Sequence, residues 1–288
     1  MNYRKTTLAP GLHLVSTPIG NARDITLRAL DTLASADLLA AEDTRMLLKL
    51  MNIHGIPLEG RRIHAFHDHS KSADRQRLLD AMLAGQSVAY ATDAGTPLIA
   101  DPGYTLVSEA RAKDVAVTAA PGPSALTMAL SVAGLPTDRF SFRGFAPPAR
   151  TARIAFLTEL SRVRDTSVFY ETPRRIADCL SDARDALGPD RVAVVCRELT
   201  KRFEEVRSGT LDDLAEHFGA STPKGELVIL LAPAEENAPV EADVDAAIIE
   251  ALTTMRVKDA ADAVAGSLGL PRRDVYQRAL RLKSGEAN

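Results

Sequence analysis

Three short segments concentrate the charged side chains that could move protons or hold anions. They are Glu-Asp-Thr-Arg at 42–45, His-Asp-His at 67–69 and Arg-Glu-Leu-Thr-Lys at 197–201. Carboxylates and imidazoles act as general bases, whereas Arg and Lys bind phosphate or carboxylate groups. Structural roles are alternatives to these functions. Asp43 fits a helix N-cap paired with a cation, and 67–69 fits a solvated turn. A fourth candidate, Asp101 near the start of a predicted helix, is accounted for by helix capping. The segment 197–201 ends an interior strand, where three charged residues favour function.

Loops rich in Gly, Pro, Ser and Thr follow four apolar runs, at 17–21, 92–97, 121–125 and 171–173. Such loops allow close backbone approach and leave amide and carbonyl groups free for a ligand. In open parallel sheets the ligand binds at the carboxyl ends of the strands. Each loop alone fits an ordinary strand-to-helix turn, but four of them converging on one edge indicate a ligand cleft.

The elements that position these loops form an α/β pattern. Strands of a mostly parallel sheet are predicted at 12–16, 37–41, 87–91 and 115–119, with crossover helices beginning near residues 24, 71 and 102. A second α/β unit has predicted strands at 167–170, 191–196, 204–207 and 226–231, and helices at 174–187 and 211–218. The fold class is therefore α/β with two α/β domains.

Turn-forming Gly and Pro residues at 134–138 and 147–148 predict a domain boundary. A Pro- and Glu-rich linker covers 232–239. Three helices follow at 244–254, 258–268 and 272–282, with a Gly-Leu-Pro turn whose spacing resembles a helix-turn-helix unit. We therefore expect an N-terminal α/β domain at 1–134, a C-terminal α/β domain at 135–233, and a linker with a helical extension at 234–288.

The charge balance gives no global sign of a polyanion partner, because the net charge of the 288 residues is -3. Any nucleic-acid surface must be local. The helical tail is locally basic, which fits either phosphate contacts or a solvated helix face. Its basic residues are Arg256, Lys258, Arg272, Arg273, Arg278, Arg281 and Lys283, and its acidic residues are Asp259, Asp262, Asp274 and Glu286.

Several other classes are disfavoured. The first strand is not followed by Gly-x-Gly-x-x-Gly, and the sequence has no Walker Gly-Lys-Ser/Thr, His-Glu-x-x-His or Cys-x-x-Cys. A Rossmann dinucleotide enzyme, a P-loop NTPase and a zinc hydrolase are poor fits, and no metal is expected. Two apolar-context cysteines, a polar N-terminus and the lack of any run of about 18 apolar residues predict a soluble, cytoplasmic protein without a membrane span.

Several motifs occur together and in order. They are Thr17-Pro-Ile-Gly-Asn21, Ala41-Glu-Asp-Thr-Arg45, His67-Asp-His69, Asp93-Ala-Gly-Thr-Pro-Leu-Ile99, Asp101-Pro-Gly-Tyr104, Pro121-Gly-Pro-Ser124, Phe169-Tyr-Glu171, Arg197-Glu-Leu-Thr-Lys201 and Lys224-Gly-Glu226. From about Leu12 to Leu231 the chain resembles the RsmI family of small-subunit ribosomal RNA cytidine 2'-O-methyltransferases, in the tetrapyrrole methylase superfamily. The tail resembles the helix-turn-helix extension of that family.

The resemblance implies a homodimer that acts on 16S ribosomal RNA, with S-adenosyl-L-methionine bound in a cleft between the two α/β domains. The implied donor contacts are Ile19, Ala94, Gly95, Thr96, Ile99, Ser124, Ala125 and Glu171. Relatives that methylate tetrapyrrole carbons resemble Gly-x-Gly-x-Gly-Asp at the first loop and Gly-Gly-Asp-Pro at the third. This chain has Thr-Pro-Ile-Gly-Asn and Ala-Gly-Thr-Pro there, which argues against a tetrapyrrole substrate.

Methyl transfer from a sulfonium depends mainly on orientation and desolvation and requires no metal in principle. A ribose hydroxyl is a poor nucleophile at neutral pH, so a general base would help. The candidate bases are Glu42, Asp43, His67, Asp68 and Glu198, and the candidate cations for RNA phosphates or the donor carboxylate are Arg45, Arg197 and Lys201. Two alternatives stay open: a tetrapyrrole C-methyltransferase, and a non-catalytic RNA-binding ribosome factor.

Overall fold

The computed structural model describes residues 2–67, 70, 72–234, 241–268 and 270–284. The chain divides into two compact units, residues 1–234 and residues 235–288. Both predicted α/β domains fall within the larger unit, and the predicted boundary after residue 134 stays a prediction. In the part of the chain that is described, no helix combines the length and apolar character needed to span a membrane.

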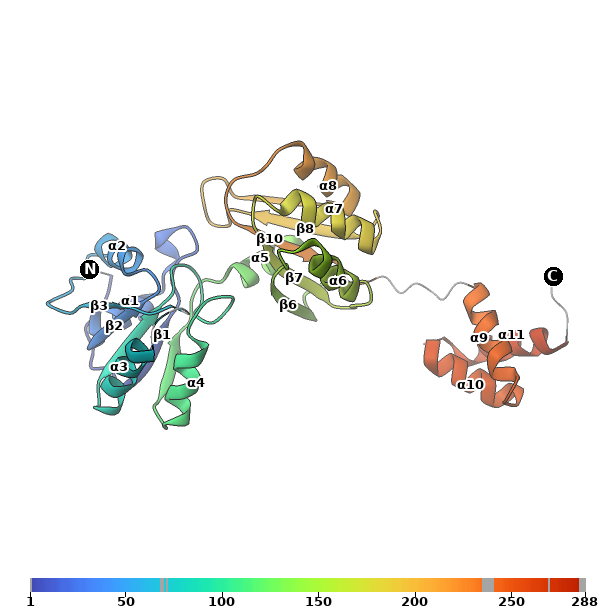
Figure 1. Ribbon diagram of the computed structural model, residues 1–288, viewed down its shortest axis with the longest axis horizontal. Helices are drawn as coiled ribbons and strands as arrows, with labels where there is room; N and C mark the ends of the chain where they lie inside the picture. The colour runs from blue at the N-terminus through green and yellow to red at the C-terminus, as the bar shows by residue number, and fades with distance from the viewer. Residues whose placement is uncertain (1, 68–69, 71, 235–240, 269, 285–288) are drawn as a thin grey trace. The chain divides into compact units, whose positions relative to one another are not determined.

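The first sheet of the larger unit has five strands that pair in parallel (Figure 1). Their order is β3 (Ile63–Ala65), β2 (Leu38–Ala41), β4 (Ser87–Ala91), β1 (Gly11–Val15) and β5 (Val117–Ala120). The short 3-10 helix η1 (Ala22–Asp24) and helices α1 (Leu27–Ser35), α2 (Thr44–Ile53), α3 (Ser72–Leu83) and α4 (Tyr104–Ala112) connect them. The predicted parallel sheet with crossover helices is confirmed.

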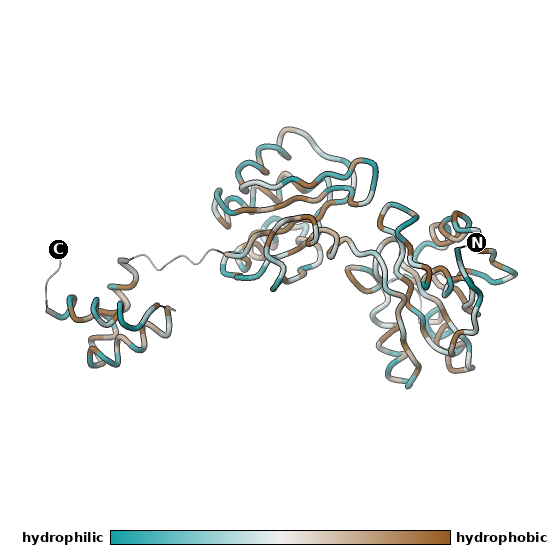
Figure 2. The backbone as a smooth tube through the Cα atoms, turned by 180° about the vertical axis from the view of Figure 1, so that it is seen from behind, coloured by the Kyte–Doolittle hydropathy of each residue, from teal (hydrophilic) through white to brown (hydrophobic). Residues whose placement is uncertain are grey.

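Both faces of this sheet are covered, which explains why β4 is apolar and buried throughout. Ala89 and Ala91 pack into a core with residues of α1 and α2, whereas Val88 and Tyr90 pack with residues of α3 and α4. Figure 2 shows the apolar residues gathered along the strands. The loops at the carboxyl ends of the strands are thereby fixed by a sheet packed on both sides.

The second sheet is mixed rather than parallel, in the order β6 (Phe140–Phe145), β7 (Thr166–Glu171), β10 (Leu227–Leu231), β8 (Val192–Arg197) and β9 (Glu205–Thr210). Strands β6 and β7 are parallel, and the other pairs are antiparallel. Helices α6 (Arg150–Leu160), α7 (Ile176–Leu187) and α8 (Leu211–Ala220) share the core of one face. Helix α5 (Ala125–Ala133), which follows β5 of the first sheet, packs against the other face.

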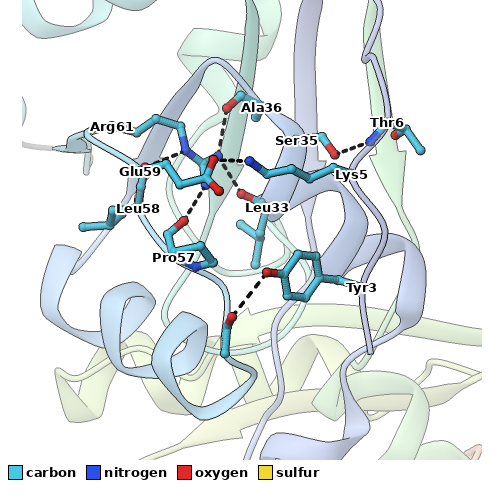
Figure 3. Close-up of polar contacts among 11 residues, drawn as sticks. Tyr3, Lys5, Thr6, Leu33, Ser35, Ala36, Pro57, Leu58, Glu59 and Arg61 are labelled. Atoms are coloured by element: carbon cyan, nitrogen blue, oxygen red, sulfur yellow. Dashed lines mark hydrogen bonds and ion pairs between the residues drawn. The ribbon is translucent and has the colours of Figure 1, made fainter. Parts of the chain in front are cut away.

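The polar contacts of Arg61 fix the chain after α1 (Figure 3). Its Nη1 donates to the carbonyls of Leu33 and Ala36 at 2.8 and 2.9 Å, and its Nε and Nη2 donate to the carbonyls of Leu58 and Pro57 at 3.0 and 3.1 Å. Arg side chains stabilise helix ends when they pair with the last carbonyls. Arg61 therefore anchors the turn from α1 into β2, whose carboxyl end reaches the candidate site.

The smaller unit consists of α9 (Glu241–Leu252), α10 (Val257–Leu268) and α11 (Arg272–Ser284). Its core includes Val244 and Ile248 of α9, Val264 of α10, and Val275 and Ala279 of α11. All three predicted helices are present. The turn between α10 and α11 includes residue 269, which lies outside the described residues.

Candidate functional site

A cavity of about 410 Å³ is lined by residues of both sheets of the larger unit. This volume lies in the range of small-molecule and cofactor sites. Its walls are formed by residues 93–96, 99–101, 124–125, 170–173 and 225–228, together with Ile19, Glu42 and Phe145. The lining combines apolar side chains, loop backbone and several carboxylates.

The structure brings the eight residues named as donor contacts together in this one lining. They are Ile19, Ala94, Gly95, Thr96, Ile99, Ser124, Ala125 and Glu171. These residues come from four segments that span more than half of the chain, so their common location follows from the fold. Their role in holding a donor stays a prediction.

Hydrogen bonds hold three loops of the first sheet together. The amide of Thr17 donates to the carbonyl of Gly95 at 2.9 Å, and the amide of Gly95 returns a bond to Thr17 at 3.0 Å. The hydroxyl of Thr96 donates to the carbonyl of Pro123 at 2.9 Å and accepts from the hydroxyl of Ser16 at 3.2 Å. Gly95 has a φ of 88°, a backbone conformation that favours glycine. The loop is thus fixed against both of its neighbours.

The fourth predicted loop, 171–173, belongs to the opposite wall. It follows β7 of the second sheet, so the expectation that all four loops converge on one sheet edge is wrong. Periodicity locates the end of a strand but does not say which sheet the strand joins. The buried side chain of Glu171 accepts from the amide of Thr172 at 2.6 Å and from Arg175 Nε at 2.8 Å. This pairing ties the start of the loop to the chain just ahead of α7.

The segment 197–201 lies beside the cavity and supports it. The amide of Glu226, a lining residue, donates to Glu198 Oε1 at 3.1 Å, while Lys201 Nζ lies 2.8 Å from Glu198 Oε1 and 3.1 Å from Glu226 Oε2. A Cβ on Gly225 would lie 2.3 Å from the Glu198 side chain, so the wall requires glycine there. Arg197 pairs with Glu205 at 3.0 Å.

The same segment contacts the first loop. The amide of Asn21 donates to the hydroxyl of Thr200 at 3.2 Å, and a Cβ on Gly20 would lie 2.4 Å from Cγ of Lys201. Glu198 and Thr200 have positive φ values of 50° and 65°. Strained backbone of this kind persists where the surroundings fix it, often next to functional sites. Arg197, Glu198 and Lys201 are absent from the cavity lining, so the geometry gives them a supporting position.

The second charged cluster divides between the lining and the start of a helix. Glu42 lines the cavity. Asp43 is the N-cap of α2: it accepts from the amide of Arg45 at 2.8 Å and pairs with the Arg45 guanidinium at 2.6 Å. The hydrogen bond from the Arg45 side chain lowers the pKa of Asp43 to about 2. So acidic a carboxyl is a weak proton acceptor near neutral pH.

Of the third cluster, His67 alone is among the described residues, and it is not part of the cavity lining. His67 follows β3, is exposed, and donates through its backbone amide to the hydroxyl of Ser70 at 2.8 Å. Asp68, the other candidate base in this cluster, lies outside the described residues. Within the described ranges, no group of three His, Cys, Asp or Glu residues is arranged to hold a metal ion.

Asp101, to which the sequence analysis assigned a capping role, lines the cavity. Helix α4 has Gly103 as its N-cap, without a side-chain hydrogen bond, so the expected capping role of Asp101 is wrong. Burial, together with the nearby carboxylates of Glu42, Asp93 and Glu226, raises the pKa of Asp101 to about 7. The available signal was an acidic residue in a Gly- and Pro-rich loop after a strand, and it is a weak one.

An aromatic group completes the wall on the side of the second sheet. Tyr170 and Phe145 line the cavity, with ring centroids 5.4 Å apart, and Phe142 packs against Tyr170 at 4.9 Å. Burial, followed by the charge of Asp101, raises the pKa of Tyr170 to about 12. Its hydroxyl therefore stays protonated at neutral pH and can donate a hydrogen bond.

Comparison with known families identifies the chain. The family model described as Tetrapyrrole (Corrin/Porphyrin) Methylases matches residues 11–215, and the model described as RsmI C-terminal HTH domain matches residues 238–283. The Ribosomal RNA small subunit methyltransferase I of Mesorhizobium japonicum is 46% identical over 98% of this chain and 96% of its own. The chain belongs to this family of tetrapyrrole methylases. The family resemblance read from the sequence is confirmed.

Other members of the family are similar over most of their length. The protein of the same name from Mycobacterium tuberculosis (strain CDC 1551 / Oshkosh) is 43% identical over 94% of each chain. Among solved structures, diphthine synthase aligns with a TM-score of 0.60 at 18% identity, covering 77% of this chain and 89% of that chain. Cobalt precorrin-4 methyltransferase aligns with a TM-score of 0.57 at 18% identity, covering 77% and 94%. At that identity the two structures show the fold. Family membership implies a methyl donor.

Proposed function

We propose that this chain transfers a methyl group from S-adenosyl-L-methionine to the 2'-hydroxyl of a cytidine ribose in 16S ribosomal RNA. One observation carries the proposal: the eight residues that family resemblance assigns to the donor line a single cavity. Relatives named Ribosomal RNA small subunit methyltransferase I, similar along nearly the whole chain, support an acceptor in ribosomal RNA. The cytoplasm, where ribosomes are assembled, is the proposed location.

The chemistry of the lining fits this donor. Its sulfonium is a cation, and the acidic side chains of Glu42, Asp93 and Glu226 in the cavity lining favour the binding of a cation. Backbone groups of the 93–96 loop can hydrogen-bond a nucleoside, and the apolar and aromatic lining side chains can pack against its base.

The chain contributes orientation and desolvation to the reaction. The donor, when bound, supplies an activated methyl group with a neutral thioether as leaving group. The two walls hold it by the fixed loops of the first sheet on one side and by β7 and β10 on the other. A closely lined site excludes water and keeps an attacking hydroxyl in line, which together account for much of the acceleration of a bimolecular transfer.

Transfer of label from S-adenosyl-L-methionine separates this proposal from its two alternatives. Incubation of the full chain with methyl-labelled donor and small ribosomal subunits lacking the modification should place label in 16S RNA. A porphyrinoid offered under the same conditions should stay unlabelled. Label in the porphyrinoid would favour a tetrapyrrole acceptor, and failure to bind the donor in calorimetry would favour a non-catalytic ribosome factor.

The smaller unit presents a surface for the RNA partner. Arg272 Nη2 lies 3.0 Å from Asp262 of α10, and Arg278 Nη2 lies 3.1 Å from Asp245 of α9. These ion pairs fix α11 against its neighbours. Another face of α11, at helical spacing of three and four residues, is exposed and carries Arg273, Tyr276, Gln277, Leu280 and Lys283. Guanidinium groups suit phosphates, and an exposed tyrosine ring can stack on an unpaired base.

Removal of two of these charges should weaken RNA binding without affecting the donor. The double variant Arg273→Ala and Lys283→Ala is expected to bind small subunits about tenfold more weakly, with a shallower dependence of the logarithm of affinity on the logarithm of salt concentration. Affinity measured at several salt concentrations checks this. Arg111→Ala with Lys113→Ala removes two exposed positive charges from the end of α4 and is the matched control. An equal loss in both double variants would point to net charge alone.

A homodimer is the assembly proposed from family resemblance. Light scattering of the purified chain should give about twice the mass of 30.9 kDa. A mass of one chain across the working concentration range would contradict it.

A further inference from the structure

Asp101 occupies a position in the cavity where three further acidic side chains gather. It lies in the loop between β4 and α4 and lines the cavity together with Glu42, which follows β2, Asp93, which follows β4, and Glu226, which precedes β10. Tyr170 of β7 faces the same space. The charged and titratable groups that act on Asp101 from the other elements are therefore acids, which disfavours its charged form.

The backbone around Asp101 holds it in this wall. Leu98 and Ala100 have positive φ values of 73° and 60°, which are unfavourable for residues with a side chain. Just after Asp101, the hydroxyl of Tyr90 donates to the carbonyl of Pro102 at 3.2 Å, and a Cβ on Gly103 would lie 2.9 Å from the Tyr90 ring. Tyr90 is fully buried in the first sheet. The loop is thus anchored to the core at the residues that adjoin Asp101.

The proton affinity of Asp101 also differs from that of Asp43 and Glu198, two of the carboxylates considered as bases. Asp43 caps a helix, with a pKa of about 2, and Glu198 accepts hydrogen bonds from Lys201 and from the amide of Glu226 that keep its pKa below the usual value despite burial. Burial and like charges instead raise the pKa of Asp101 to about 7. A general base works best when its pKa lies near the working pH.

We propose that the carboxylate of Asp101 accepts the proton of the attacking ribose hydroxyl, an inference that rests on the proposed function. The hydroxyl oxygen forms its new bond to the methyl carbon, and the carbon–sulfur bond breaks with its electron pair remaining on sulfur. The O–H proton passes to a carboxylate oxygen of Asp101 and then to solvent. Atoms and charge balance without any further reactant.

The donor's positive charge gives this assignment a second consequence. A cation beside a carboxyl group favours its ionised form and lowers its pKa. Binding of the donor should therefore convert protonated Asp101 into the carboxylate that the reaction needs, and should release a proton to solvent. The catalytic base would be generated by the donor itself.

Calorimetry of donor binding tests this step without any methyl transfer. Titration of the chain with S-adenosyl-L-methionine at pH 7, in buffers of different ionisation enthalpy, should show release of roughly half a proton per donor, because a group with a pKa near 7 is half protonated there. Asp101→Asn should bind the donor with no such release. Asp93→Asn, which removes a like charge from the same cavity, should keep the release, with its maximum at lower pH.

Single-turnover methylation of small subunits tests the catalytic step. The wild-type rate should rise with pH through an inflection at or below about 7, whereas Asp101→Asn should lose the inflection and be slower by about 100-fold or more. Asp101→Glu retains a carboxyl and should recover part of the rate. Thermal unfolding checks the fold of each variant, and Asp101→Ser serves in place of the amide should Asp101→Asn not fold.

Different results would contradict the role of Asp101 and the proposed substrate. Two results for Asp101→Asn would overturn the assignment. One is donor binding with the proton release of the wild type; the other is methyl transfer within tenfold of the wild-type rate with the inflection intact. A wild-type chain that releases the Asp101 proton on binding the donor but methylates no ribosomal RNA would instead contradict the proposed substrate. Asp101 would then remain the proton-accepting group of the cavity.

Discussion

Replacement of Ala125 with Phe should abolish measurable donor binding, with a loss of affinity of at least about 100-fold, or about 2.7 kcal/mol. Ala125 is the first residue of α5 and lines the cavity. A phenyl ring added there would occupy space assigned to the donor, and the helix that carries it is packed against the second sheet and cannot retreat freely. Isothermal titration with S-adenosyl-L-methionine measures the effect.

A control on the same helix separates occupation of the cavity from damage to α5. Thr127 is exposed two residues further along and lies outside this cavity. Thr127→Phe introduces the same ring outside the cavity and removes one hydrogen bond, from the Thr127 hydroxyl to the carbonyl of Ser124; it should leave donor affinity within about threefold, since substitutions of exposed residues usually have small effects. Wild-type affinity in Ala125→Phe would mean that the donor binds elsewhere, and the cavity assignment would be wrong.

Loss of the Asp182 carboxylate should give a large decrease in stability. Asp182 of α7 and Arg153 of α6 are each 4% exposed, and Arg153 Nη2 lies 2.6 Å from Asp182 Oδ2. The exposed Arg150 adds a contact of 3.0 Å to Oδ1. Removal of one partner of a buried pair leaves an uncompensated charge, so Asp182→Ala should lower the free energy of unfolding by about 3–5 kcal/mol. Urea unfolding followed by circular dichroism measures it.

The contribution of Asp182 to the free energy of unfolding should depend on pH. Burial opposes ionisation of Asp182, but hydrogen bonds from Arg150 and Arg153 outweigh it and hold its pKa below the ordinary value. Its contribution is therefore fully present above the unfolded pKa, near 4, and is lost as the pH falls through the lower folded value. Asp185→Ala, which removes a 59% exposed carboxylate from the same helix, should cost about 0.5 kcal/mol or less. Equal losses in the two variants would contradict the role of the buried pair.

Four of the five strands of the first sheet could be predicted from the sequence, because each is a short and mainly apolar run between helical patterns. The run Ser87–Ala91 was predicted with the bounds that β4 has, since it is buried on both faces and apolar throughout. The loops after β1, β4 and β5 follow directly from such strand ends. Residues such as Gly95 and Ser124 could therefore be placed near a ligand without knowledge of contacts between distant parts of the chain.

The strands and pairing of the second sheet were predicted less completely from the sequence. Strand β6 was missed, because Phe140–Phe145 contains Gly144 at a φ of 68° and follows a stretch rich in turn residues. Antiparallel pairing of β7, β10, β8 and β9 depends on long-range contacts that periodicity does not encode. For the same reason, sequence reasoning could not show that the segment 197–201 supports the wall at Gly225 and Glu226.

The chemical role proposed for Asp101 could not be predicted from the sequence. Its chemical interest comes from burial and from Glu42 and Glu226, which are distant in sequence and meet it in the folded chain. In the sequence, a carboxylate near a helix start has an ordinary explanation in capping. The α4 N-cap at Gly103 removes that explanation.

Mass spectrometry of the RNA shows directly whether the chain methylates the ribose of a cytidine in 16S RNA. Small subunits from cells without this gene are incubated with the purified chain and donor, and the RNA is digested to nucleosides and to mapped fragments. We expect 2'-O-methylcytidine at one position, present with the wild-type chain and absent with Ala125→Phe. A methyl group on a base, on another molecule, or on no RNA at all would contradict it.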